Sequence, residues 1–79
     1  MLMNETNEFD SEEKKRPLTK KELVILELIT QGKSNTEIAK ELILSVHTVK
    51  AHVCTILHKM GVKDRVQAAV KAVKQNLVP

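Results

Sequence analysis

The chain has 79 residues, of which 42% are hydrophobic and only Phe9 is aromatic, and its formal net charge is +3. A chain of this length forms one small domain with a modest core, so a large catalytic cleft is not expected. No apolar run is long enough for a signal peptide or a membrane span. The single cysteine, Cys54, cannot form an internal disulfide, which fits a cytoplasmic protein with no membrane partner.

The charge is distributed unevenly along the chain. Residues 1–16 hold five acidic and three basic side chains, whereas residues 17–79 hold five acidic and ten basic ones. The first segment is polar and without periodicity, which predicts a disordered tail or linker over 1–16. The charge of +5 on residues 17–79 suits a domain that binds a polyanion. Surface lysines that only maintain solubility would give the same balance.

Aliphatic residues recur at helical spacing over 17–79, with no strand-like alternation. This pattern predicts an all-α, four-helix bundle-like domain containing a helix-turn-helix. The helices are expected at about 19–31, 35–42, 46–60 and 65–75. Thr19 with Glu22 and Ser34 with Glu37 have the spacing of capping boxes, in which a hydroxyl and a carboxylate each accept a backbone N–H at the helix start.

The remaining helix boundaries have weaker signals. Ser45 is expected to cap the third helix, and Asp64 with Gln67 forms a weaker capping box for the fourth. Gly32 and Gly61 are expected to end the first and third helices in the left-handed conformation, and Asn76 takes that role after the fourth. The short connection between the second and third helices forces a sharp corner.

The third predicted helix has two contrasting faces. A rotation of about 100° per residue places its larger apolar residues in one core stripe, Val49, Val53, Ile56 and Met60. The outer face consists of His47, Lys50, Ala51, Cys54 and His58, and one flank of Thr48, His52, Thr55 and Lys59. No acidic residue occurs between Val46 and Met60, although an exposed helix normally carries mixed charge.

Such a face is typical of a helix inserted in the major groove of DNA. Small side chains at its centre permit deep insertion, and hydroxyl, imidazole and ammonium groups can reach phosphates that would repel a carboxylate. A basic face without any partner is the alternative.

Residues 18–78 resemble the LuxR/FixJ-type helix-turn-helix domain of bacterial transcription regulators. The matching stretches are LTKKE (18–22), GKSNTEIAKEL (32–42), LSVHTVKAH (44–52) and ILHKMGVKDRVQAA (56–69). The resemblance implies a four-helix domain whose third helix reads the major groove and whose fourth helix commonly forms a dimer contact. It implies sequence-specific binding of double-stranded DNA, either by a stand-alone regulator or by one domain of a longer protein.

The resemblance also implies roles for individual positions. It assigns base contacts to Lys50, Ala51 and Cys54, and the outer face of the helix adds His47. The phosphate contacts that it assigns, together with Thr55 from the flank, are Ser34, Asn35, Thr48, His52, Thr55, Lys63 and Arg65. Four positions depart from the family pattern, namely Lys21, Cys54, Lys71 and Asn76.

The fourth predicted helix has more apolar residues than one core face needs. Its larger residues form one stripe, Val66, Val70, Val73 and Leu77, with Ala68, Ala69 and Ala72 near the edges. We expect this stripe to form the contact of a homodimer. A single wide core face is the alternative.

Other functions are weighed against DNA binding. Cys54 and His58 lie one helical turn apart, but no acid orients the imidazole for catalysis and zinc needs four ligands, so no enzyme, metal or cofactor is expected. Oxidation of Cys54 inside a groove would block binding, as a thiol switch. A promoter- or polymerase-interacting module of sigma region type, with RNA polymerase as partner, is the alternative. Steep salt dependence on duplex DNA distinguishes the two.

Overall fold

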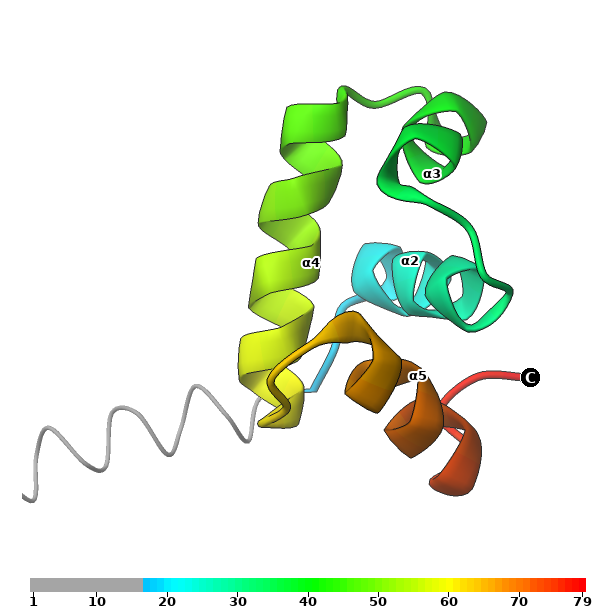
Figure 1. The fold of residues 1–79 in the computed structure, drawn as a ribbon, viewed down its shortest axis with the longest axis vertical. Helices are drawn as coiled ribbons and strands as arrows, with labels where there is room; N and C mark the ends of the chain where they lie inside the picture. The colour runs from blue at the N-terminus through cyan, green and yellow to red at the C-terminus, as the bar shows by residue number, and fades with distance from the viewer. Residues whose placement is uncertain (1–16) are drawn as a thin grey trace, which may run out of the picture.

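The computed structural model describes residues 17–79, and the predicted tail over 1–16 lies outside these residues. The elements are the helices α2 (Lys20–Thr30), α3 (Asn35–Leu42), α4 (Val46–Met60) and α5 (Arg65–Lys74). Each begins and ends within one residue of the predicted bounds, and the all-α prediction is confirmed. Figure 1 shows α4 along one side of the domain, with α3, α2 and α5 placed one after another beside it. Within the described part, no helix is long and apolar enough to cross a membrane.

The helix starts follow the capping signals closely. Both predicted capping boxes form: the Thr19 and Glu22 side chains each accept the other residue's backbone N–H, at 3.1 and 2.9 Å. The same exchange occurs between Ser34 and Glu37, at 3.1 and 2.7 Å. Each box satisfies two backbone donors that the first turn leaves without a partner. The start of α2 and the start of α3 are therefore defined by residues close in sequence.

The cap of α5 corrects one prediction. Asp64 caps the helix as expected, since its carboxylate accepts the Gln67 N–H at 2.9 Å. The Gln67 side chain, however, accepts the backbone N–H of Lys63 at 3.0 Å and does not return to Asp64. The predicted capping box is therefore only half formed, because the amide reaches one residue further back along the loop.

Among residues 17–79, four adopt positive φ, and one of them was not predicted. Gly32, Gly61 and Asn76 follow α2, α4 and α5 in the expected left-handed conformation. Ile43, at the corner between α3 and α4, also has a φ of +56°, and its side chain is 90% exposed. A β-branched residue is rare in this region because its Cβ crowds the backbone. The corner closes with the Leu44 N–H donating to the Ala39 carbonyl at 2.8 Å, so its geometry overrides the preference of the residue.

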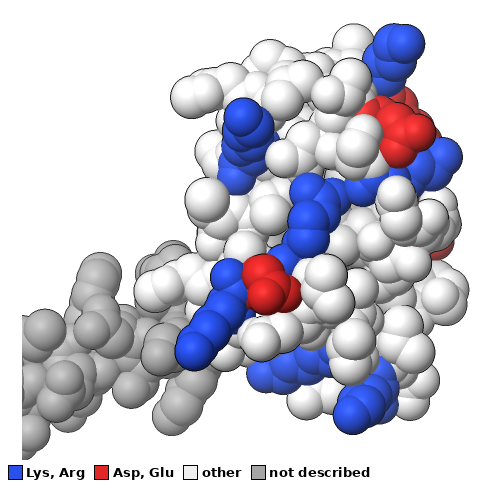
Figure 2. Space-filling view, viewed as in Figure 1, with Lys and Arg blue, Asp and Glu red and all other residues white. Residues whose placement is uncertain are grey.

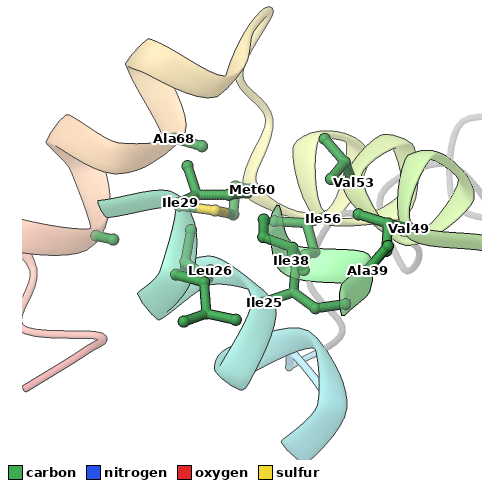
Figure 3. Close-up of a cluster of buried hydrophobic side chains, with 12 residues drawn as sticks. Ile25, Leu26, Ile29, Ile38, Ala39, Val49, Val53, Ile56, Met60 and Ala68 are labelled. Carbon is green, nitrogen blue, oxygen red and sulfur yellow. The ribbon is translucent and has the colours of Figure 1, made fainter. Parts of the chain in front are cut away.

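The core is aliphatic and draws on all four helices (Figure 3). The predicted stripe of α4 is buried against Ile25, Leu26 and Ile29 of α2 and Ile38 and Ala39 of α3. On α5 the buried residues are Ala68 and Ala72. Short alanine side chains allow α5 to lie close to α2, with which it has extensive contact.

A nearly buried ion pair joins the end of α4 to the start of α2. The Lys59 ammonium near the end of α4 lies 2.9 Å from the Glu22 carboxylate in the first turn of α2, and both side chains are less than 10% exposed. Burial acts to raise the pKa of Glu22, but the hydrogen bonds from Lys59 and Thr19 and the Lys59 charge hold it below its ordinary value of 4.5. Lys59, predicted on the flank of α4, is therefore an internal residue.

Replacing Val49 by aspartate should unfold the domain. Val49 is fully buried, and an unpaired carboxylate at this position would cost several kcal/mol, on the order of the whole stability of a small domain. Circular dichroism should show no cooperative thermal transition. Val46→Asp is the matched control, since Val46 is partly exposed in the first turn of α4 and should tolerate an acid. A cooperative melt of Val49→Asp near that of the parent would mean that Val49 is not in the core.

The Glu22–Lys59 pair should make stability depend on pH. Because the pKa of Glu22 is lowered by folding, its contribution is present above about 4.5 and is lost as the pH falls through the folded-state pKa. We expect the parent to exceed Glu22→Gln in free energy of unfolding at neutral pH. The difference should shrink below pH 4.5 in urea titrations. A difference that is constant down to acid pH would contradict the role of this carboxylate.

Candidate nucleic-acid interface

The rotation of α4 about its own axis follows from its buried stripe. Because Val49, Val53, Ile56 and Met60 face the core, the opposite side of the helix faces solvent. All five residues predicted on the outer face are exposed: His47, Lys50, Ala51, Cys54 and His58. Thr48, His52 and Thr55 on the flank are half-buried, as their angular position requires. The predicted helical phase is confirmed.

The threonine hydroxyl groups of α4 differ in whether their proton is already donated to another group of the domain. The Ser45 hydroxyl accepts the Thr48 N–H at 3.0 Å and donates to the Thr48 hydroxyl oxygen at 2.9 Å. The Thr48 hydroxyl proton is not used in this contact. The Thr55 hydroxyl instead donates to the Ala51 carbonyl at 3.2 Å, within its own helix. Thr48 is therefore the better placed of the two to donate to a phosphate.

The electrostatics of this side are set by where the acidic residues lie. No acid occurs on α4, whose exposed face carries Lys50 and two histidines. Among the acids, Glu22 pairs with Lys59, while Glu37 and Asp64 cap helix starts. The backbone N–H of Ser34 holds the pKa of Glu37 below its ordinary value, so this carboxylate stays ionised at its cap. Figure 2 shows blue side chains spread over one face of the domain, with red ones in few places.

A second polar cluster lies where the start of α3 meets the start of α5. The Arg65 guanidinium donates to the Asn35 side-chain oxygen at 2.7 Å and to the Lys33 carbonyl at 2.8 Å. Two residues predicted to contact phosphates are thus in direct contact with each other. Ser34 and Lys63, predicted for the same role, are exposed nearby in sequence. Spacing alone gives no signal for this contact, because the partners are 30 residues apart.

The outer surface of α5 is apolar. Val66 is 68% exposed and Val73 is 62% exposed, and Val70 is also exposed. Leu77, predicted on the same stripe, is exposed but lies beyond the end of α5, after the left-handed Asn76. The core is closed by Ala68 and Ala72, so the alternative of one wide core face is wrong. The Lys71 ammonium donates to the Met60 carbonyl at 2.7 Å. It thereby satisfies a carbonyl at the end of α4, where a cation is electrostatically favoured.

Cys54 is exposed on the outer face of α4, with His58 one turn further along. Within the described residues, no group of three or more His, Cys, Asp or Glu side chains could hold a metal ion. Cys54 and His58 are both part of the exposed surface of α4.

Comparison with known proteins agrees with this geometry. Residues 16–72 match the family described as bacterial regulatory proteins, luxR family. The transcriptional regulatory protein LiaR of Bacillus subtilis is 54% identical over 61 residues, which cover 77% of this chain and 29% of that protein. The uncharacterized transcriptional regulatory protein YhcZ of the same species is 49% identical over 78 residues, covering 98% and 36%.

The response regulator protein VraR of Staphylococcus aureus is 48% identical over 61 residues, covering 77% of this chain and 29% of that protein. The chain spans about a third of the length of these relatives. The family match favours the predicted regulator domain over the sigma-type module. The chain combines four helices with an acid-free outer face on α4, and it matches the family over most of its length. It therefore belongs to the luxR family of bacterial regulatory proteins.

Proposed function

We propose that residues 17–79 bind double-stranded DNA sequence-specifically as part of a bacterial transcription regulator, with α4 inserted in the major groove. The observation that carries this proposal is the outer face of α4, which is exposed, free of acids and small at its centre, at Ala51 and Cys54. A backbone bearing small side chains can approach the base edges closely. The domain acts by binding and not by catalysis, and residues 1–16 serve as a tail or linker.

Base readout is assigned to His47, Lys50, Ala51 and Cys54, which share the exposed face. Lys50 is long enough to reach the acceptors at a guanine edge, whereas Ala51 offers only an apolar contact suited to a thymine methyl group. Cys54 is a weak donor and acceptor, so it contributes shape more than discrimination. Lys50 therefore carries most of the sequence preference.

Phosphate contacts are assigned to residues on both sides of that face. Thr48 and His52 lie on one flank of α4, and Thr48 has a hydroxyl proton to donate. Ser34 and Asn35 lie at the start of α3, whose dipole favours an anion, and Lys63 is exposed before α5. Thr55 is the weakest of these candidates, because its hydroxyl donates to Ala51. The Arg65 guanidinium is already engaged, since it donates to Asn35 and Lys33.

The stripe of Val66, Val70, Val73 and Leu77 is assigned to a homodimer contact. Its support is the exposure of three valine side chains along one side of α5, with Leu77 exposed just beyond the end of the helix. Exposed apolar side chains grouped in this way favour a contact with another protein surface. A twofold dimer would place two copies of α4 on successive turns of the duplex.

Selection of bound sites from random duplex DNA tests the proposed function. The selected duplex should bind at least about a thousandfold more tightly than a scrambled duplex of the same length. Affinity should also fall steeply and linearly with the logarithm of salt concentration. No enrichment in the selection, or equal affinity for both duplexes, would refute sequence-specific binding.

Replacing Lys50 or His52 by alanine should separate base readout from phosphate contact. Each change should weaken binding by about 1–3 kcal/mol, because each removes a contact to the duplex. Lys50→Ala should also relax the sequence preference, whereas His52→Ala should weaken all duplexes alike. Affinities for the selected duplex and its single-base variants check this. Equal losses across sequences for both variants would contradict the assignment of Lys50 to base readout.

Replacing Val73 by glutamate should abolish dimerisation without unfolding the domain. Val73 is 62% exposed, so the carboxylate would remain in water in the monomer but would be buried in the proposed contact. Sedimentation equilibrium, with and without a duplex carrying two half-sites, measures the association. Gln67→Glu on the same helix is the control, since Gln67 lies off the stripe. If Val73→Glu associates as the parent does, the contact lies elsewhere.

A further inference from the structure

Arg65 occupies an unfavourable place for a cation, and its contacts explain why it is tolerated there. It is the first residue of α5, where the positive end of the helix dipole disfavours a basic side chain. Two short hydrogen bonds offset this cost, to the Asn35 side-chain oxygen at 2.7 Å and to the Lys33 carbonyl at 2.8 Å. Asn35 is the first residue of α3, and Lys33 lies two residues before it. The guanidinium therefore ties α5 to the segment that is proposed to lie on the DNA backbone.

The chemistry of the two side chains fixes the orientation of Asn35. A guanidinium has only donors, so Asn35 must present its oxygen to Arg65. Its amide NH₂ is then directed away from Arg65, and none of the hydrogen bonds found within residues 17–79 begins at this group. Asn35 is partly exposed at the first position of α3, where an anion is favoured. Two donors at this place that are not used within residues 17–79 match a phosphate oxygen.

We propose that Arg65 is a positioning residue, which holds the Asn35 amide with its donors facing a DNA phosphate and does not itself provide the principal contact. This inference rests on the proposed DNA binding. Without Arg65, the amide could rotate and present its oxygen to the phosphate, which would be repulsive. The fork of the guanidinium is essential, because it binds two acceptors at once, whereas a lysine ammonium is a point charge on a flexible stem.

Charge-preserving substitution distinguishes positioning from direct contact. Arg65→Lys keeps the cation, so a phosphate contact would survive, whereas positioning would be lost. We expect Arg65→Lys and Asn35→Ala each to bind the selected duplex about tenfold more weakly than the parent. The double variant should bind no more weakly than either single variant, because both remove the same contact. The slope of the logarithm of affinity against the logarithm of salt concentration should be unchanged, since the lost contact is made by a neutral amide. Lys74→Arg, at the other end of α5, is the control and should bind as the parent does.

A phosphate-specific readout separates this role from a purely structural one. Each phosphate of the selected duplex is replaced in turn by a neutral methylphosphonate, and the loss of affinity is measured. The parent should be sensitive at one phosphate where Asn35→Ala and Arg65→Lys are both insensitive. Their sensitivity at all other phosphates should be that of the parent, which a general loss of folding would not produce. Binding is measured well below the thermal midpoint of each variant.

Asn35→Asp keeps the test decisive if Arg65→Lys does not fold. This variant retains an acceptor for Arg65 but has no NH₂ group, so its thermal midpoint should not fall while its affinity drops at least tenfold. Parent-like binding by Arg65→Lys or by Asn35→Asp would overturn the inference, as would additive losses in the double variant. Failure of the parent to select any duplex would instead refute the proposed function itself.

Discussion

Burial of the aliphatic stripe of α4 is the constraint on which the rest of the molecule depends. Val49, Val53, Ile56 and Met60 pack against α2 and α3, and the core that they enter, as described for residues 17–79, has no aromatic side chain. A helix with one buried stripe has only one stable rotation about its axis, so burial on one side determines which residues are exposed on the other. The face proposed to read DNA is thus a consequence of packing on the opposite face.

Basic residues with internal partners complete the arrangement of the helices. Lys59 reaches Glu22 in α2, Lys71 reaches the Met60 carbonyl at the end of α4, and Arg65 reaches the start of α3. Each of these contacts joins a helix to a neighbouring segment, and in a small core such contacts add orientation to the hydrophobic energy. The positive charge of the domain therefore has two roles. Part of it connects helices, and part remains on the surface for a polyanion.

The sequence predicts what local chemistry decides. Hydroxyls and carboxylates three residues apart defined the helix starts, and a 3.6-residue period defined the faces of α4. The contact between Glu22 and Lys59, which are 37 residues apart, cannot be predicted from the spacing of residues in the sequence. On α5 both stripes are apolar, and only side-chain size decides that the alanines pack while the valines stay exposed. Ile43 was missed because its left-handed conformation is imposed by the corner and contradicts its own propensity.

Protection of thiols by bound DNA tests the orientation of α4 most directly. The native Cys54 and, in a Cys54→Ser background, single variants Ala51→Cys and Val24→Cys are treated with a thiol reagent with and without the selected duplex. All three positions are exposed in the free domain, and Val24 lies on α2, behind the core stripe of α4. DNA should slow the reaction at positions 51 and 54 and leave position 24 unchanged. Slowing at position 24 together with unchanged reaction at 51 and 54 would contradict insertion of this face of α4 in the groove.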